Sequence, residues 1–184
     1  MKRRYLISAS LACVMIAGCA AQSGESATAS AEAAPAAAPV FIRSTMQNDV
    51  NPAIMAIWDV TNNVYTDAGE QDPSLITEAG WAALNENAAK LARYGDAMAN
   101  AGTIHSAAPG NMEVGEYEVT MEDVQTLIDR AEPAFRAMSA NFATLARNLE
   151  AAAQAKDGTT AIDAAGQIDE ACAACHAIYW YGEV

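Results

Sequence analysis

The sequence predicts an all-α fold, an antiparallel four-helix bundle, from three observations. From Phe41 onward, apolar residues recur at steps of three and four, which is the spacing of one helical face. The alternating apolar and polar runs that predict strands are scarce. One stretch rich in Gly, Pro and acidic residues, 102–118, interrupts the periodicity and predicts a long connection between the second and third helices.

The first predicted helix covers about 43–66. Pro52 lies inside this segment and predicts a kink or a loosened turn, because proline lacks an N–H and its ring clashes with the preceding turn. The expected inward stripe consists of Met46, Val50, Ala53, Ile57 and Val64.

The second predicted helix covers about 74–101, with Ser74 as its N-cap and Gly102 as its stop signal. Its steps of three and four are broken only at Gly95. The expected inward face consists of Trp81, Leu84, Ala88, Leu91 and Met98.

The third predicted helical segment begins after Thr120. Together with Asp123, three residues later, Thr120 resembles a capping box. Pro133 predicts a kink there, or a short helix that feeds a longer one. Gly158 is expected to end this segment, and Thr159 or Thr160 to cap the last helix. The two inward stripes are Met121, Val124, Ile128, Ala131, Phe135, Met138, Phe142, Leu145, Leu149 and Ala152, then Ala161, Ala165, Ile168, Cys172, Cys175 and Tyr179.

The N-terminus has the pattern of an export signal, predicted to cover residues 1–18. Basic residues at 2–4 precede an apolar run that is shorter than the about 20 residues of a membrane-spanning helix. The end of that run, Ile16-Ala17-Gly18-Cys19, resembles the lipobox of bacterial lipoproteins. The resemblance implies lipidation of Cys19, whereas cleavage after Ala20 would leave a soluble protein.

The segment 19–40 is predicted to be a flexible tether, because it is rich in Ala, Ser, Glu and Pro and has few apolar side chains to bury. The folded domain is then expected to be 41–184. Within the lipoprotein resemblance, Ala20 after the cysteine favours anchorage in the outer membrane over the inner one.

Charge limits the classes of partner. Without the three basic residues at 2–4, the chain carries 7 basic and 23 acidic residues, a net charge of −16. Nucleic-acid binding is excluded, because phosphates require a basic surface. Partner proteins with basic docking surfaces are expected instead.

The strongest motif is Cys172-Ala173-Ala174-Cys175-His176, the spacing of c-type haem attachment. Residues three and four apart share a helical face, so both sulfurs and the imidazole are expected to project together. The cysteines would form thioethers to one haem c, and His176 would be the proximal iron ligand. A dithiol redox site or a zinc site with His105 as a further ligand are the alternatives.

A helical bundle whose only Cys-x-x-Cys-His lies in its C-terminal helix resembles the cytochrome c prime family, over about 43–181. Met46, Pro52 and Trp58 resemble a similarly spaced trio in one subgroup. The resemblance implies a periplasmic haem protein, with homodimers formed through the first two helices. One departure is that no Arg or Lys follows His176 in His176-Ala177-Ile178-Tyr179-Trp180.

The resemblance also implies that function depends on the sixth iron ligand. Met46 is the candidate for a low-spin haem that transfers single electrons, with Met55 and His105 as lesser candidates. An open position would instead bind small gases such as nitric oxide. We expect Trp58 and Tyr179 to wall the haem pocket. Arg43 and Arg93 are candidates for pairing with propionates, but the default for both is an ordinary surface arginine without such a specific contact.

No nucleophile with a base and no phosphate-binding loop is present in the sequence, so an enzyme is not expected. A third hypothesis is a structural lipoprotein with a metal site or a disulfide at its C-terminal end.

Overall fold

The computed structural model describes residues 37–116 and 118–181. The predicted signal peptide, Cys19 and most of the predicted tether lie outside the described residues. The described part is predominantly helical, which confirms the predicted all-α class. Its helical elements are α1 (Ile42–Thr45), η1 (Met46–Val50), α2 (Asn51–Thr61), η2 (Pro73–Leu75), α3 (Glu78–Ala99), α4 (Met121–Arg130), α5 (Glu132–Ala155) and α6 (Gly158–Tyr179).

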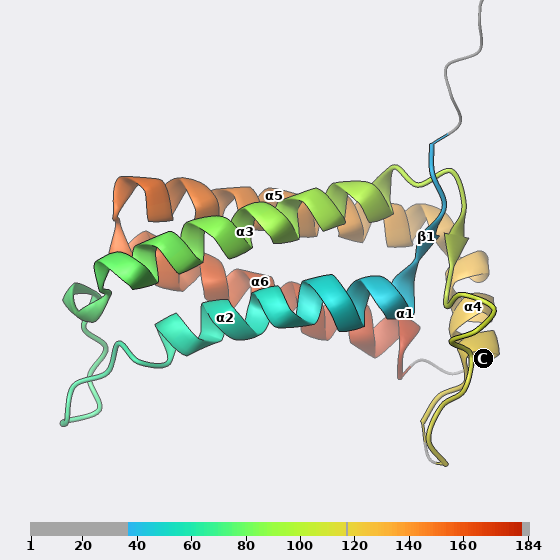
Figure 1. The fold of residues 1–184 in the computed structure, drawn as a ribbon, viewed down its shortest axis with the longest axis horizontal. Helices are drawn as coiled ribbons and strands as arrows, with labels where there is room; N and C mark the ends of the chain where they lie inside the picture. The colour runs from blue at the N-terminus through green and yellow to red at the C-terminus, as the bar shows by residue number, and fades with distance from the viewer. Residues whose placement is uncertain (1–36, 117, 182–184) are drawn as a thin grey trace, which may run out of the picture. The chain divides into compact units, whose positions relative to one another are not determined.

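The long helices contact one another in a ring of pairs: α2 with α3, α3 with α5, α5 with α6, and α6 with α2. Figure 1 shows the α2–α3 connection and the α5–α6 join at one end of these helices. The start of α1, the ends of α3 and α6, and helix α4 lie toward the opposite end (Figure 1). Elements far apart in the sequence therefore meet where α6 ends.

A short parallel pair of strands joins the start of the described chain to the long connection. Strand β1 (Val40–Phe41) pairs with β2 (Ile104–His105), and Gly102 N donates to Ala38 O at 3.1 Å. The last residues of the predicted tether are thus hydrogen-bonded to the connection. The sequence did not predict these strands, because two-residue strands carry no usable periodicity.

Both predicted proline effects are present. The turn before Pro52 is a π-helical turn, η1, in which Asn51 N–H donates to Met46 O. Pro133 lies in the first turn of α5, so that α4 is a short helix followed by a longer one. At a helix start a missing N–H costs little, which is why proline is tolerated there.

Two predicted caps were wrong and one was confirmed. The side chain of Thr77, rather than Ser74, caps α3 by accepting from Gly80 N. Asp157 caps α6 in place of a threonine, because its carboxylate accepts from Thr160 N at 3.1 Å. Gly158 consequently begins α6 instead of ending the previous helix. Thr120 accepts from Asp123 N, as predicted.

The core receives side chains from all of the long helices. Close approach of α3 to α5 explains the break at Gly95, because a Cβ there would lie 2.8 Å from the Cβ of Ala143. The largest fully buried side chains include Ile57, Leu84, Leu91, Met121, Ile128, Leu149 and Ile168.

Among the residues that the structure describes, no helix is long and apolar enough to cross a membrane.

Candidate functional site

The Cys-x-x-Cys-His motif lies in the last two turns of α6. Cys172 and Cys175 are half-buried, and His176 is exposed. The helix ends directly after the motif, where Trp180 N and Tyr181 N both donate to His176 O at 2.9 Å. All three motif side chains line one cavity, as expected of residues that share a helical face.

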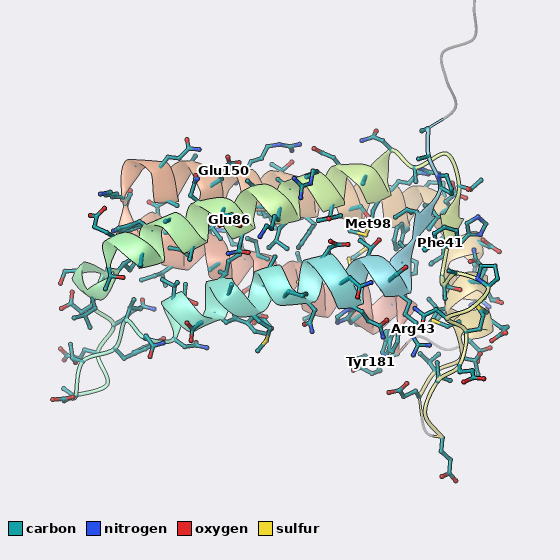
Figure 2. The ribbon with its side chains drawn as sticks, in the orientation of Figure 1. Phe41, Arg43, Glu86, Met98, Glu150 and Tyr181 are labelled. Atoms are coloured by element: carbon teal, nitrogen blue, oxygen red, sulfur yellow. The ribbon has the colours of Figure 1, made fainter. Side chains whose placement is uncertain are left out.

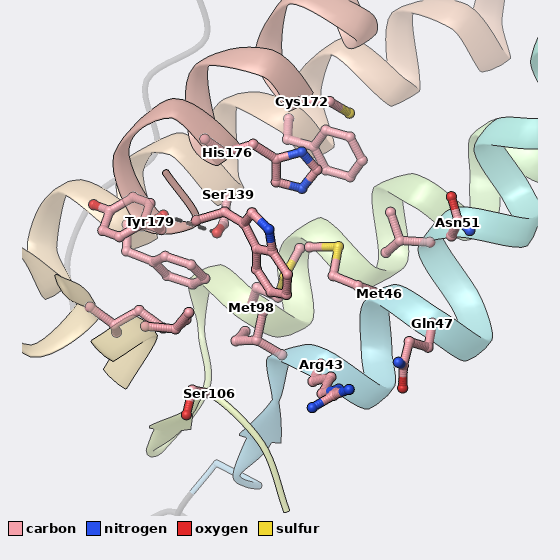
Figure 3. Close-up of a pocket in the computed structure, with 18 of the residues that line it drawn as sticks. Arg43, Met46, Gln47, Asn51, Met98, Ser106, Ser139, Cys172, His176 and Tyr179 are labelled. Atoms are coloured by element: carbon pink, nitrogen blue, oxygen red, sulfur yellow. Dashed lines mark hydrogen bonds between the residues drawn. The ribbon is translucent and has the colours of Figure 1, made fainter. Parts of the chain in front are cut away.

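This cavity has a volume of about 410 Å³ and lies where α1, η1 and α2 face the end of α6 (Figure 3). Figure 2 shows Arg43, Met98 and Tyr181 toward this end of the helices, whereas Glu86 and Glu150 lie toward their other half. Most of the lining is apolar, including Val50, Ile54, Met121, Val124, Ile128 and Phe142.

Met46 lies across this cavity from the motif. Figure 3 shows the Met46 side chain and the His176 imidazole extending into the cavity from opposite walls. Trp58 and Tyr179 line the same cavity. The sequence therefore identified residues from two helices distant in the chain that meet at one site.

The two lesser ligand candidates do not belong to the cavity. Met55 is 53% exposed and is absent from the cavity lining. His105 is exposed on β2, where its ring stacks on Phe41 with centroids 5.3 Å apart. Among the candidates that the sequence suggested for the position opposite His176, only Met46 lines the cavity.

Sequence reasoning assigned two further cavity methionines only to the core. Met98 of α3 and Met121 of α4 both line the cavity and are 3% and 0% exposed. Met98 and Met46 enter the cavity from different helices in Figure 3. Their inward helical spacing was the only signal, and it does not separate a core filler from a metal ligand.

Tyr179 holds the last turn of α6 against the α4–α5 join. Its hydroxyl donates to Ala131 O at 3.2 Å, and its ring meets the edge of Phe135 with centroids 5.2 Å apart. Burial, with a smaller contribution from Cys175, raises the pKa of Tyr179. This contact fixes the orientation of the turn that carries His176.

Burial disfavours the thiolate form of both motif cysteines. Burial, followed by the charges of Cys175 and Asp169, raises the pKa of Cys172 to about 11. Burial also raises the pKa of Cys175. Dithiol redox sites instead depend on lowered thiol pKa values. These electrostatics do not favour the dithiol alternative.

The two arginines proposed for propionate pairing differ in position. Arg43 lines the cavity, and its guanidinium donates to the backbone carbonyls of Asn111 and Glu113. Arg93 is exposed, lies over the ring of Tyr94 at 5.1 Å, and is absent from the cavity lining. Only Arg43 is therefore beside the cavity.

The residues present fit a c-type haem. Two thiols and an imidazole border an apolar cavity whose volume is within the about 300–1,000 Å³ of cofactor sites. In the described ranges, no three His, Cys, Asp or Glu side chains are grouped so as to hold a metal ion by themselves.

Comparison with protein-family models, curated proteins and solved structures gives no match for this chain.

Proposed function

We propose that this protein is a mono-haem c-type cytochrome of the cytochrome c prime type that transfers single electrons in the periplasm. The observation that carries the proposal is the Cys-x-x-Cys-His face of α6, which borders an apolar cavity with a methionine on its far wall. Lipidated Cys19 would tether the protein to a membrane, and the outer membrane is favoured.

Each residue of the site has a distinct proposed role. Cys172 and Cys175 would hold the haem through thioethers, His176 would be its proximal ligand, and Met46 would be the sixth ligand. The iron of such a group supplies one-electron chemistry, with a potential set by its axial ligands and by its burial. Apolar side chains around the cavity exclude water, and Tyr179 keeps the turn of His176 in place.

We further propose that α2, α3, α5 and α6 form an antiparallel four-helix bundle around this site. The pairwise helix contacts support that arrangement, as does the position of the two short connections at a shared end. The acidity of the chain favours partner proteins with basic docking surfaces. Electron transfer between proteins, rather than an enzymatic reaction, is the activity expected of such a site.

Haem attachment is tested on the full chain produced in bacteria with an intact cytochrome c maturation system. After denaturing electrophoresis, haem staining should reveal a single coloured band, because only thioether-bound haem survives denaturation. The Cys172→Ala/Cys175→Ala variant, loaded in an amount matched by total-protein staining, should give a band without haem stain. A colourless, iron-free wild-type protein would refute the proposal and leave the structural lipoprotein hypothesis.

The sixth ligand is tested by visible and near-infrared spectroscopy of the purified ferric protein. The wild type should be low-spin and show a thioether-to-iron charge-transfer band, which Met46→Leu should abolish. Met98→Leu is the matched control, since it removes a second cavity thioether of the same chemistry and should leave the band unchanged. High-spin wild-type protein that binds nitric oxide tightly would establish the five-coordinate alternative instead.

A further inference from the structure

The first helical segment lines the cavity with a row of residues at steps of four, Ile42, Met46, Val50, Ile54 and Trp58, and with the adjacent residues Arg43, Gln47 and Asn51. In an α-helix, each four-residue step passes a full turn by about 40°, so four such steps accumulate about 160°. An unbroken α-helix would therefore turn its first and last cavity residues to nearly opposite faces. In the structure, however, this row of residues stays at one cavity, so a local change in the helix must offset part of the rotation.

The π-helical turn η1 provides the offset. Its defining hydrogen bond runs from Asn51 N–H to Met46 O, five residues back. A π turn contains more than four residues, so a four-residue step inside it falls short of a full turn instead of passing it. Without η1, Met46 would point about 80° away from the direction of Ile54, eight residues later. The wider turn brings both side chains to the cavity.

Pro52 explains why the turn is wide. In an unbroken α-helix this residue would donate to Asn48 O, but proline has no N–H and its ring clashes with that carbonyl. Widening the preceding turn relieves the clash. Pro52 itself is exposed and does not line the cavity. Its effect on the site therefore passes through the backbone.

A hydrogen bond to the neighbouring helix and a buried side chain hold η1 in place. Tyr94 of α3 donates its hydroxyl to Asp49 Oδ1 at 2.5 Å, and Val50 is 5% exposed. The turn is thus fixed in place, and the direction of Met46 is fixed with it.

We propose that Pro52 is a positioning residue, which directs the Met46 thioether at the haem iron by enforcing the π turn. The proposal rests on the proposed His176/Met46 ligation. It assigns to Pro52 a role in the coordination state of the haem that is distinct from a contribution to stability.

The test begins with Pro52→Ala in the haem-loaded protein. The variant can adopt an unbroken α-helix, which would turn Met46 away, so the thioether-to-iron band should fall to less than half of its wild-type intensity and high-spin bands should appear. Pro73→Ala is the control, because it removes a proline from the first turn of η2, in the α2–α3 connection at the other end of the helices in Figure 1. It should leave the spectrum unchanged.

A register-shift rescue separates positioning from damage to the helix. In an unbroken α-helix, residue 47 is seven residues before Ile54, only about 20° short of two full turns. Moving the methionine with Met46→Ala/Gln47→Met should therefore restore the band when Pro52→Ala is also present. The same pair of substitutions should fail to give the band while Pro52 is retained.

Each possible result either supports or overturns the positioning role of Pro52. A wild-type protein without the band refutes the His176/Met46 ligation and the role of Pro52 together. A band present in the wild type and undiminished in Pro52→Ala overturns the positioning role and leaves the ligation intact. If Pro52→Ala loses the band and the shifted methionine does not restore it, the proline acts through general helix integrity, which also overturns the proposal.

Discussion

Helices α3 and α5 share the most extensive contact in the described part of the chain, whereas α2 and α6 touch only sparsely. Between α3 and α5, Gly95 faces the backbone of Ala143 so closely that no Cβ fits without a shift. Between α1, η1 and α2 on one side and the end of α6 on the other, a cavity of about 410 Å³ separates the helices.

The comparison shows how one small fold provides both rigidity and space for a cofactor. Small residues let α3 and α5 approach until their backbones nearly touch, which makes this pair a close-packed support. The cavity is lined by the motif cysteines, by Met46, Met98 and Met121, and by residues of the irregular turn η1. The π turn and the cavity lie together at the place where the proposed haem would pack.

The largest effect is expected from loss of the haem, which should destabilise α2 and α6 far more than α3 and α5. In Cys172→Ala/Cys175→Ala, α2 and the end of α6 would lose contacts on the scale of a large core truncation, about 2–5 kcal/mol. Amide hydrogen exchange, followed by mass spectrometry, should therefore accelerate by roughly tenfold or more in α2 and α6, and much less in α3 and α5. Uniform acceleration in all four helices would contradict the comparison.

The close packing of α3 and α5 is tested by Gly95→Ala. The new Cβ would lie 2.8 Å from the Cβ and 2.9 Å from the backbone nitrogen of Ala143, so the helices must separate. We expect urea unfolding, followed by circular dichroism, to give a loss of about 1–3 kcal/mol. The control is Gly166→Ala in α6, where no atom outside the adjacent backbone of the same helix lies within 4 Å of the new Cβ. Improved helix propensity should make that variant more stable by up to about 1 kcal/mol.

A smaller effect is expected at the tyrosine that orients the turn of His176. Tyr179→Phe removes the hydrogen bond to Ala131 O and keeps the ring packing, so it should cost about 0.5–1.5 kcal/mol in the same urea assay. Tyr181→Phe, at a side chain that is 76% exposed, should change stability by less than about 0.5 kcal/mol. Equal effects of the two variants would show that the hydroxyl of Tyr179 does not hold the turn.

The smallest effect is expected at the α5–α6 join, which Figure 1 shows at the opposite end of the helices from α4 and the end of α6. Hydrogen bonds from the Thr160 side chain and amide lower the pKa of Asp157 below its usual range. The folded state then favours the carboxylate, so this stabilisation is present at neutral pH and is lost as the pH falls through the lowered pKa. Asp157→Ala should lower the melting temperature at pH 7, and the difference from wild type should shrink toward about pH 3. A difference that is independent of pH would rule out the charged cap.

Much of the fold followed from local patterns. The stripe with Ala53 and Ile57 is buried, the long connection has the expected place, and the effects of Pro52 and Pro133 are present. Helix boundaries were less accurate, as with Ser74, because several polar residues in a row can act as caps and only the backbone geometry selects one. The strands β1 and β2 were missed, since their pairing joins segments that are distant in the chain.

The sequence by itself determined the chemistry of the candidate site and the spacing of its parts. Cys172, Cys175 and His176 share a face because a helix repeats every 3.6 residues, whatever surrounds it. Only the tertiary structure decided what that face meets. It brought Met46, Met98 and Met121 to one cavity, excluded Met55 and His105, and set the rotation of Met46 through η1. Helical periodicity is a property of neighbouring residues, whereas the walls of a cavity depend on how whole helices pack.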